Sequence, residues 1–356
     1  MKISRKTTMI MIGVICLVFT VMAAMPASAA EATKLTFASF RAENDYWVPA
    51  FKEWVKDFTA KTNGRYVIEM SWGGGMGASK DYYNMLTNSV FDIANWQPTL
   101  LPGRFPMSEL MTLPIEAPSI SAPSMAFHEL FMKGYLDKEF SSAKILFVWA
   151  GAGNMMAQNK RPAATVEEMK GIRIGNSGGY AIDVLKAANA VPVNMSLGQR
   201  YISIEKGIID GTMGTWAAMY TAKFYEILHY ATEPGMCSFP FVMLMNKRTY
   251  DKLPQDIKAI VDEMAKSDKY AKLIGQLGDS NIEKGKKAFL ENKGTISRWN
   301  KDDFAKIGAA LNPLWKKAVA DTEAKGYPAK KAIGDLYKAM KGLGVEEPFV
   351  GYTPGE

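Results

Sequence analysis

Residues that could perform covalent or acid–base chemistry are sparse in this chain of 356 residues. The two histidines, His128 and His229, have no metal-ligand spacing, and neither adjoins a Gly-x-Ser-x-Gly nucleophile motif. Cys237 has no evident histidine partner, and a buried thiol is a common state of such a cysteine. We therefore expect no catalytic residue, metal or cofactor, and a binding protein rather than an enzyme. The alternative is an exported hydrolase acting on a small polar substrate.

Side chains that could bind a ligand stand where predicted strands end. Phe40 and Arg41 follow the first apolar extended run, where a ligand can reach them, although a solvated surface charge is an equal interpretation of Arg41. Asn176 follows a short β-branched run, and its amide can both donate and accept hydrogen bonds. Trp216 follows a glycine-containing turn, where it either stacks on a solute or packs in the core.

The stretch 169–201 has the clearest pattern of elements able to position such residues. A β-branched run at Ile172 and Ile174 is followed by a glycine turn at 176–179, an apolar-periodic helix and a second extended run at 191–195. This order predicts a compact βαβ unit with a parallel pair of strands. A cleft at the strand ends is the natural ligand site of such a unit.

A second glycine turn at 73–78 follows the predicted strand 66–72 and formally fits G-x-G-x-x-A. The acid that a dinucleotide fingerprint places at a strand end is absent there, because Asp92 stands before the next apolar run. We interpret these glycines as a tight strand-to-helix turn that lines the cleft. Trp96 ends the following strand, and either faces the cleft or lies in the core.

Apolar periodicity predicts the remaining elements. Strands are expected at 35–40, 66–72, 91–96, 144–149 and 239–245, and helices around 48–58, 82–86, 126–132, 202–208 and 254–264. Glycines follow the strand 144–149, and we place a crossing between two lobes there because glycine permits close backbone approach. Two lobes are expected because single cores stop growing at roughly 250–300 residues.

Residues 1–30 have the composition of a cleavable signal peptide, with a basic start, an apolar run at 9–22 and small residues at 27–29. That run is short for a bilayer span, so the processed chain is not expected to span a membrane. Removing three basic residues from the formal charge of +7 leaves +4, which is too mild to indicate a nucleic-acid partner. Cys237 is the sole cysteine after residue 30, so no intramolecular disulfide is expected.

Several short motifs occur together in a fixed order. They are MKGIRI at 169–174, ANAVPV at 188–193, QRY at 199–201 and GIIDG at 207–211. Together they resemble the core signature of the solute-binding proteins of tripartite ATP-independent periplasmic (TRAP) transporters, the DctP-like family. Further matches extend the resemblance over most of the processed chain, at 61–65, 102–106, 113–114, 160–162, 245–247 and 253–254.

The resemblance implies an α/β, two-lobed periplasmic binding protein of the type II-like class. A ligand cleft lies between the lobes, and crossing strands and a long helix link them. We assign 31–151 and about 239–280 to lobe I, and 152–238 and about 281–356 to lobe II.

In function, the resemblance implies a periplasmic receptor that binds a small polar solute, with an organic acid favoured. The receptor closes about a hinge and delivers the solute to the integral-membrane subunits of a TRAP-type secondary transporter. We expect a monomer.

The resemblance also assigns ligand contacts. Family members often carry a ligand-contacting polar residue or arginine where Asn154 stands, and an aromatic or small polar residue facing the solute where Trp96 stands. Phe239 begins the second crossing and is assigned to the site as well.

One departure from the family concerns charge. Most members carry, at the position of Gly175, an arginine that holds a carboxylate through two parallel hydrogen bonds, and a glutamate at the position of Gln199. Because both charges are absent here, no unpaired buried charge remains from that pair. Either the anion is held by Arg173, on the same strand face as Gly175, or by Arg41 from the other lobe, or the solute is not a simple monocarboxylate.

Overall fold

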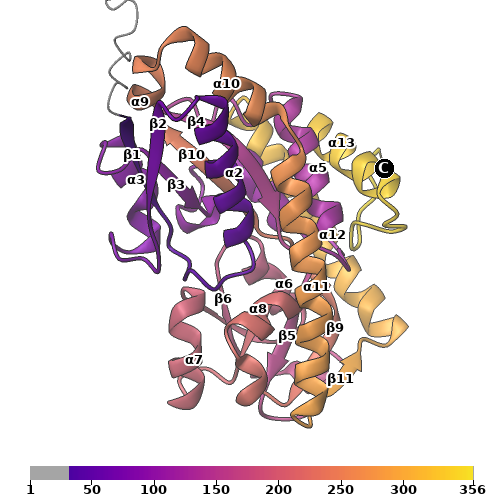
Figure 1. Ribbon diagram of the computed structural model, residues 1–356. Coiled ribbons are helices and arrows are strands. Elements are labelled where there is room, and N and C mark those ends of the chain that lie inside the picture. The colour runs from indigo at the N-terminus through magenta and orange to yellow at the C-terminus, as the bar shows by residue number, and fades with distance from the viewer. Residues whose placement is uncertain (1–31, 356) are drawn as a thin grey trace, which may run out of the picture.

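The computed structural model describes residues 32–355, so the predicted signal peptide 1–30 lies outside the described part. Two lobes are stacked one above the other, each built on its own sheet, with helices around them (Figure 1). This arrangement confirms the expected two-lobed α/β fold. None of the helices between residues 32 and 355 is both long and apolar enough to cross a membrane.

Lobe I contains a five-stranded sheet in the order β2-β1-β3-β10-β4. Strand β1 is parallel to β2 and β3, whereas β10 is antiparallel to β3 and β4. Helices cover both faces of the sheet, which is why β10 is buried along its whole length and reads as one continuous apolar run. The elements are β1 (Thr33–Ala38), α2 (Val48–Lys61), β2 (Tyr66–Ser71), α3 (Tyr82–Thr87), β3 (Ile93–Trp96), α4 (Pro106–Glu109), α5 (Ser121–Met132), β4 (Ala143–Ala150), β10 (Pro240–Asn246), α9 (Lys247–Lys252) and α10 (Gln255–Lys266).

Lobe II contains a six-stranded sheet in the order β11-β9-β5-β8-β6-β7. Strands β6 and β7 are parallel and are joined by α6, which confirms the predicted βαβ unit. The elements are β5 (Asn154–Gln158), β6 (Arg173–Asn176), α6 (Ala181–Ala187), β7 (Val191–Asn194), α7 (Leu197–Glu205), β8 (Gly211–Gly214), α8 (Trp216–Thr221), β9 (Tyr230–Met236) and β11 (Thr295–Arg298).

Two chain crossings and one long helix connect the lobes around the cleft, and the C-terminal helices pass between the lobes once more. Residues 151–153 lead from β4 to β5, and residues 237–239 lead back from β9 to β10. The crossings are joined by a hydrogen bond from the Gly151 N–H to the Phe239 carbonyl. Gly153 of the first crossing lies against Gly235 near the end of β9, and a Cβ on either would collide with the carbonyl of the other, so both positions require glycine. The helix α11 (Lys269–Glu291) runs along both lobes and packs against α5 of lobe I and α8 of lobe II (Figure 1).

The C-terminal helices depart from the predicted division of the chain, which assigned 281–356 to lobe II. Helix α12 (Lys301–Ala324) contacts α6 of lobe II, but α13 (Ala329–Gly342) packs against α5 of lobe I. The apolar stripe of α13, including Ile333 and Leu336, shares a core cluster with Leu130 of α5. Burial of this stripe brings the end of the chain back to lobe I.

Candidate ligand-binding site

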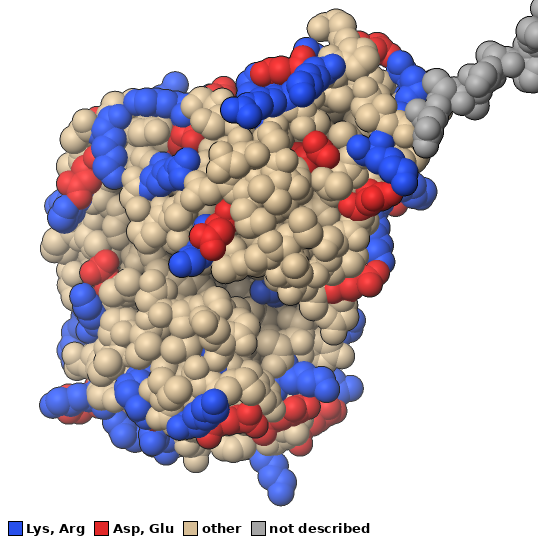
Figure 2. All heavy atoms as spheres, turned by 90° about the vertical axis from the view of Figure 1, so that its left-hand side faces the viewer, with Lys and Arg blue, Asp and Glu red and all other residues tan. Residues whose placement is uncertain are grey.

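A cavity of about 490 Å³ lies between the two lobes and is lined by residues from both. The space-filling view shows a hollow between the upper and lower parts of the molecule, with mostly uncharged surface around it (Figure 2). Its volume lies within the range of small-molecule sites. The cavity stands at the ends of β1, β4, β6 and β8, as expected for a cleft at strand ends.

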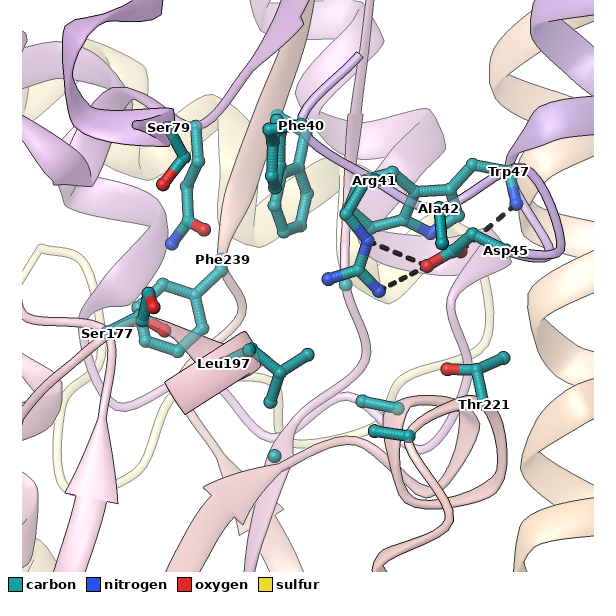
Figure 3. Close-up of a pocket in the computed structure, with 18 of the residues that line it drawn as sticks. Phe40, Arg41, Ala42, Asp45, Trp47, Ser79, Ser177, Leu197, Thr221 and Phe239 are labelled. Carbon is teal, nitrogen blue, oxygen red and sulfur yellow. Dashed lines mark hydrogen bonds and ion pairs between the residues drawn. The ribbon is translucent and has the colours of Figure 1, made fainter. Parts of the chain in front are cut away.

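The lobe I wall is mainly aromatic. Phe40 and Trp47 meet edge to face with ring centroids 6.3 Å apart, and the Trp47 ring lies 4.5 Å from that of Phe241. Phe40 from the loop after β1 and Phe239 from the second crossing point into one common space, and Leu197 of lobe II faces them from α7 (Figure 3). This wall offers a flat apolar surface to a ligand.

The glycine turn after β2 completes the lobe I wall. Gly73 and Gly74 have φ values of 72° and 74°, a left-handed conformation that favours glycine. Their backbone N–H groups donate to the carbonyls of Arg41 (2.8 Å) and Ser39 (3.0 Å), which fixes the segment carrying Phe40. The glycines therefore shape the cleft, as the sequence predicts.

Arg41 lines the cavity with its charge already balanced. Its Nε donates to Asp45 Oδ2 over 2.7 Å, and its Nη2 forms an ion pair with the same oxygen (Figure 3). The guanidinium carbon lies 4.6 Å from the centroid of the Trp47 ring, a cation–π contact. A ligand anion would have to compete with Asp45 for this arginine.

Arg200, on α7 of lobe II, is a cation of the cavity wall that was not among the residues predicted from the sequence. Other wall residues that were not among them include Asp45, Trp47, Ser177, Leu197 and Phe241. Arg200 is 1% exposed, and Nη1 donates to Thr212 Oγ1 (3.0 Å) and to the Met213 carbonyl (2.8 Å). Nη2 donates to Ser177 Oγ (2.5 Å) and to the Met195 carbonyl (3.1 Å). Within the described chain all of these acceptors are neutral.

The electrostatics of Arg200 follow from this environment. Burial, together with the nearby charge of Arg41, lowers the pKa of Arg200 to about 9. A buried cation without an anion beside it is unfavourable, so the site is prepared for a negative charge. A signal was present in the sequence, because Arg200 stands four residues before Ile204 and shares the buried face of α7 with it.

Asn154 also lies in the cavity wall, as expected. Its side chain is buried, and Nδ2 donates to the Cys237 carbonyl over 2.6 Å. That hydrogen bond ties β5 to the second crossing. Of the nine predicted site residues, the structure brings together four at the cavity: Phe40, Arg41, Asn154 and Phe239.

Neither predicted tryptophan lies in the cavity wall. Trp96 is on the face of β3 that packs against α3, where its ring is 5.1 Å from those of Tyr83 and Phe105. Trp216 begins α8, its ring lies 5.3 Å from that of Phe289, and its Nε1 donates to Glu233 over 2.7 Å. Both side chains belong to the lobe cores.

The predicted residues on β6 are likewise outside the wall. Arg173 begins the strand, away from the cavity, and donates from Nε and Nη2 to the carboxylate of Asp210 over 2.9 and 2.8 Å. Those hydrogen bonds hold the pKa of Asp210 well below its usual range. Gly175 lies inside the sheet, and Asn176 is fully buried, with Oδ1 accepting from the N–H of Gly178 over 2.9 Å. Asn176 therefore shapes the turn after β6.

The turn itself, Gly175 to Gly179, formally matches Gly-x-Ser-x-Gly. Ser177 does line the cavity, but its Oγ accepts a hydrogen bond from Arg200, and neither His128 nor His229 is in the cavity wall. A serine beside a cation and without a base is suited to holding a ligand rather than to attacking one.

Solved structures with a similar fold include several TRAP solute-binding proteins. A TRAP solute-binding protein from a marine metagenome, specific for aromatic acid ligands and solved with 3-hydroxybenzoate, is 25% identical, with a TM-score of 0.80 over 88% of this chain and 99% of that one. A TRAP periplasmic solute-binding protein of Bordetella bronchiseptica with bound mandelate has a TM-score of 0.81 at 18% identity, over 87% of this chain and 99% of that one.

Sequence comparison gives the same picture. The ectoine-binding periplasmic protein TeaA of Halomonas elongata is 22% identical over 305 residues, which cover 83% of this chain and 85% of the relative. The model of the family described as "Bacterial extracellular solute-binding protein, family 7" (DctP) matches residues 37–322. This match covers most of the chain, including the β6–α7 signature and the residues of the cavity. The chain therefore belongs to bacterial extracellular solute-binding protein family 7, and its two lobes form a solute-binding receptor.

Proposed function

We propose that this receptor binds a small organic monoacid with an aromatic or similarly flat apolar body. The observation that carries the proposal is the Arg200 cation, buried in the cavity wall beside neutral acceptors. An arginine in this state binds a carboxylate strongly, because the anion supplies both hydrogen-bond acceptors and the missing charge.

The charge of the ligand follows from the charged residues of the wall. Of the described residues, Arg41, Asp45 and Arg200 are the charged ones that line the cavity. Asp45 neutralises Arg41, so one positive charge remains at Arg200. A monoanion balances that charge, whereas a dianion would bring an unbalanced negative charge into a buried site.

The place of the carboxylate follows from the hydrogen bonds of Arg200. Ser177 Oγ and the Met195 carbonyl satisfy Nη2 but carry no charge. A carboxylate that takes over one of these positions keeps the hydrogen bond and neutralises the cation. The Ser177 hydroxyl can then turn and donate its own proton to the ligand.

The body of the ligand follows from the rings opposite. Phe40, Phe239 and Leu197 surround the centre of the cavity, and Trp47 and Phe241 lie behind them. Aromatic acids are the ligands named for two similar structures, the marine protein with 3-hydroxybenzoate and a Rhodoferax ferrireducens protein with benzoate. Their fold and the aromatic wall of this cavity together support the aromatic class.

In the cell, the chain is exported by its signal peptide 1–30, captures the acid in the periplasm and delivers it unchanged to TRAP-type membrane subunits. Closure occurs about residues 151–153 and 237–239, with α11 bending or sliding between the lobes. Contacts from both lobes to one ligand favour the closed form.

The test is a thermal-shift and calorimetric screen of the processed protein with matched pairs of acids and amides. Benzoate, 3-hydroxybenzoate and mandelate are compared with benzamide, 3-hydroxybenzamide and mandelamide. We expect the acids to bind and the amides to bind much more weakly; an acid at about 100 times its dissociation constant adds roughly 2.7 kcal/mol to the free energy of unfolding. Equal binding of acid and amide would contradict the proposal, and steady conversion of the ligand would favour the hydrolase alternative.

A further inference from the structure

Gly175 has little free space around it, although its backbone conformation does not call for glycine. Its φ lies outside the left-handed region, so the backbone itself accepts any residue. A Cβ built on Gly175, however, would stand 2.8 Å from Ile209 Cδ1, 3.1 Å from Arg200 Cδ and 3.3 Å from Arg200 Cγ. A side chain at position 175 would therefore press on two neighbours, the end of Ile209 and the stem of Arg200, and both would have to shift to admit it.

The stem of Arg200 crosses β6 at this point. Gly175 is paired with Thr212 of β8, and Arg200 donates to Thr212 Oγ1 over 3.0 Å and to Ser177 Oγ just beyond β6. The guanidinium thus reaches the cavity end of β6 by passing over Gly175. A side chain at position 175 would occupy the same path.

The backbone of Arg200 belongs to helix α7, whose first turn is fixed by a capping box. Ser196 and Gln199 form a capping box at the start of α7, with Gln199 Oε1 accepting from the Ser196 N–H over 3.2 Å and from Ser196 Oγ over 3.0 Å. Gln199 is neutral and turned toward Ser196, so the residue next to Arg200 brings no carboxylate to it. The Arg200 guanidinium therefore reaches the cavity without a carboxylate beside it to balance its charge.

We propose that Gly175 is a positioning residue for the acid-binding cation: by lacking a side chain it leaves the path along which Arg200 of α7 reaches the ligand. This inference rests on the proposed function. It implies that the size of residue 175 controls the preference for acids over neutral ligands, although residue 175 does not line the cavity.

The first test needs no ligand and consists of melting temperatures for Gly175→Ala, Arg200→Ala and the double variant. We expect Gly175→Ala to lower the melting temperature by about 2–6 °C, because an added methyl group overpacks the site. In the Arg200→Ala background the same change should cost less, since the contacts with Cγ and Cδ of the stem are gone and only the contact with Ile209 Cδ1 remains. The control is Gly214→Ala in the neighbouring strand β8, whose Cβ would meet no atom within 4 Å and should leave the melting temperature nearly unchanged. An equal loss in both backgrounds would overturn the inference.

The second test measures the affinities of Gly175→Ala for benzoate and benzamide by calorimetry. We expect the benzoate-to-benzamide affinity ratio to fall at least about tenfold with the amide affinity retained, because displacement of the guanidinium removes a charge-assisted contact. A general loss of stability would weaken both ligands alike and would leave the ratio unchanged, which contradicts a positioning role. If the wild-type protein shows no preference for benzoate, the proposed function fails, while the ligand-free cycle still decides whether Gly175 positions Arg200.

Discussion

The two lobes contribute unlike halves to one cavity. Lobe I supplies aromatic rings and a charge pair, Arg41 with Asp45, that is already neutral. Lobe II supplies short polar groups, backbone carbonyls, the apolar side chain of Leu197 and the single unbalanced cation, Arg200. On the proposed function, we expect lobe II to select acids by charge and lobe I to select them by shape.

The largest expected effect on ligand affinity comes from removing the positive charge of lobe II at Arg200. Arg200→Met should weaken binding of benzoate at least about 100-fold, because loss of a buried charged contact costs roughly 2–5 kcal/mol. The unliganded variant should be as stable as the wild type or more stable, since an apolar residue replaces a buried unbalanced cation. Calorimetry and thermal melting check both halves. A variant that retains its benzoate affinity would remove the distinction between the lobes.

The matched control is Arg173, which is in the same lobe but outside the cavity wall. Arg173→Met should make the protein less stable, because the hydrogen bonds to the Asp210 carboxylate are lost, and leave benzoate affinity unchanged. The Asp210 pKa is lowered in the folded state, so the contribution of the pair is present above the usual Asp range and is lost as pH falls below about 4. Urea unfolding at neutral and acid pH measures it. Loss of affinity without loss of stability would make Arg173 a ligand contact.

A smaller effect on ligand affinity is expected from removing an aromatic ring of lobe I. Phe40→Ala should weaken benzoate about tenfold, as expected for losing part of a buried aromatic contact, and should affect acetate little. The ratio of benzoate to amide affinity should stay the same, because the charge resides in the other lobe. Titrations with benzoate, acetate and benzamide measure these affinities. A collapse of the benzoate-to-benzamide ratio would show that lobe I also contributes to the preference for a charged ligand.

The smallest effect is expected from removing the neutral pair. The double variant Arg41→Met with Asp45→Asn should keep the preference for benzoate over benzamide within about threefold, because the pair has no net charge to offer. The same titrations check this. If the preference is abolished, Arg41 leaves Asp45 to bind the acid, and the cavity takes its charge from both lobes.

The sequence predicted the elements better than the residues that face the ligand. The βαβ unit, the glycine turn at 73–78 and the first crossing all follow from local patterns of apolar residues and glycine. Trp96 ends β3, as the sequence predicts, but its side chain lies on the face that packs against α3, because one residue of strand register decides between core and cleft. Arg173 was misplaced because sharing a strand face with Gly175 does not place it at the same end of the strand.

Arg200 could not be assigned from strand patterns at all. Its position depends on two distant facts, the absence of a side chain at Gly175 and the orientation of α7 across the sheet. The periodicity of α7 indicates that Arg200 is buried, but only tertiary structure shows that it reaches the cavity.

The most direct test of the account is a thermodynamic cycle between ligand charge and Arg200. Calorimetry with benzoate and benzamide on the wild type and Arg200→Met gives four affinities and one coupling free energy. We expect a coupling of at least about 2 kcal/mol, because the carboxylate and the Arg200 guanidinium balance each other's charge in the site. A coupling near zero, with benzoate still bound by both proteins, would contradict the account.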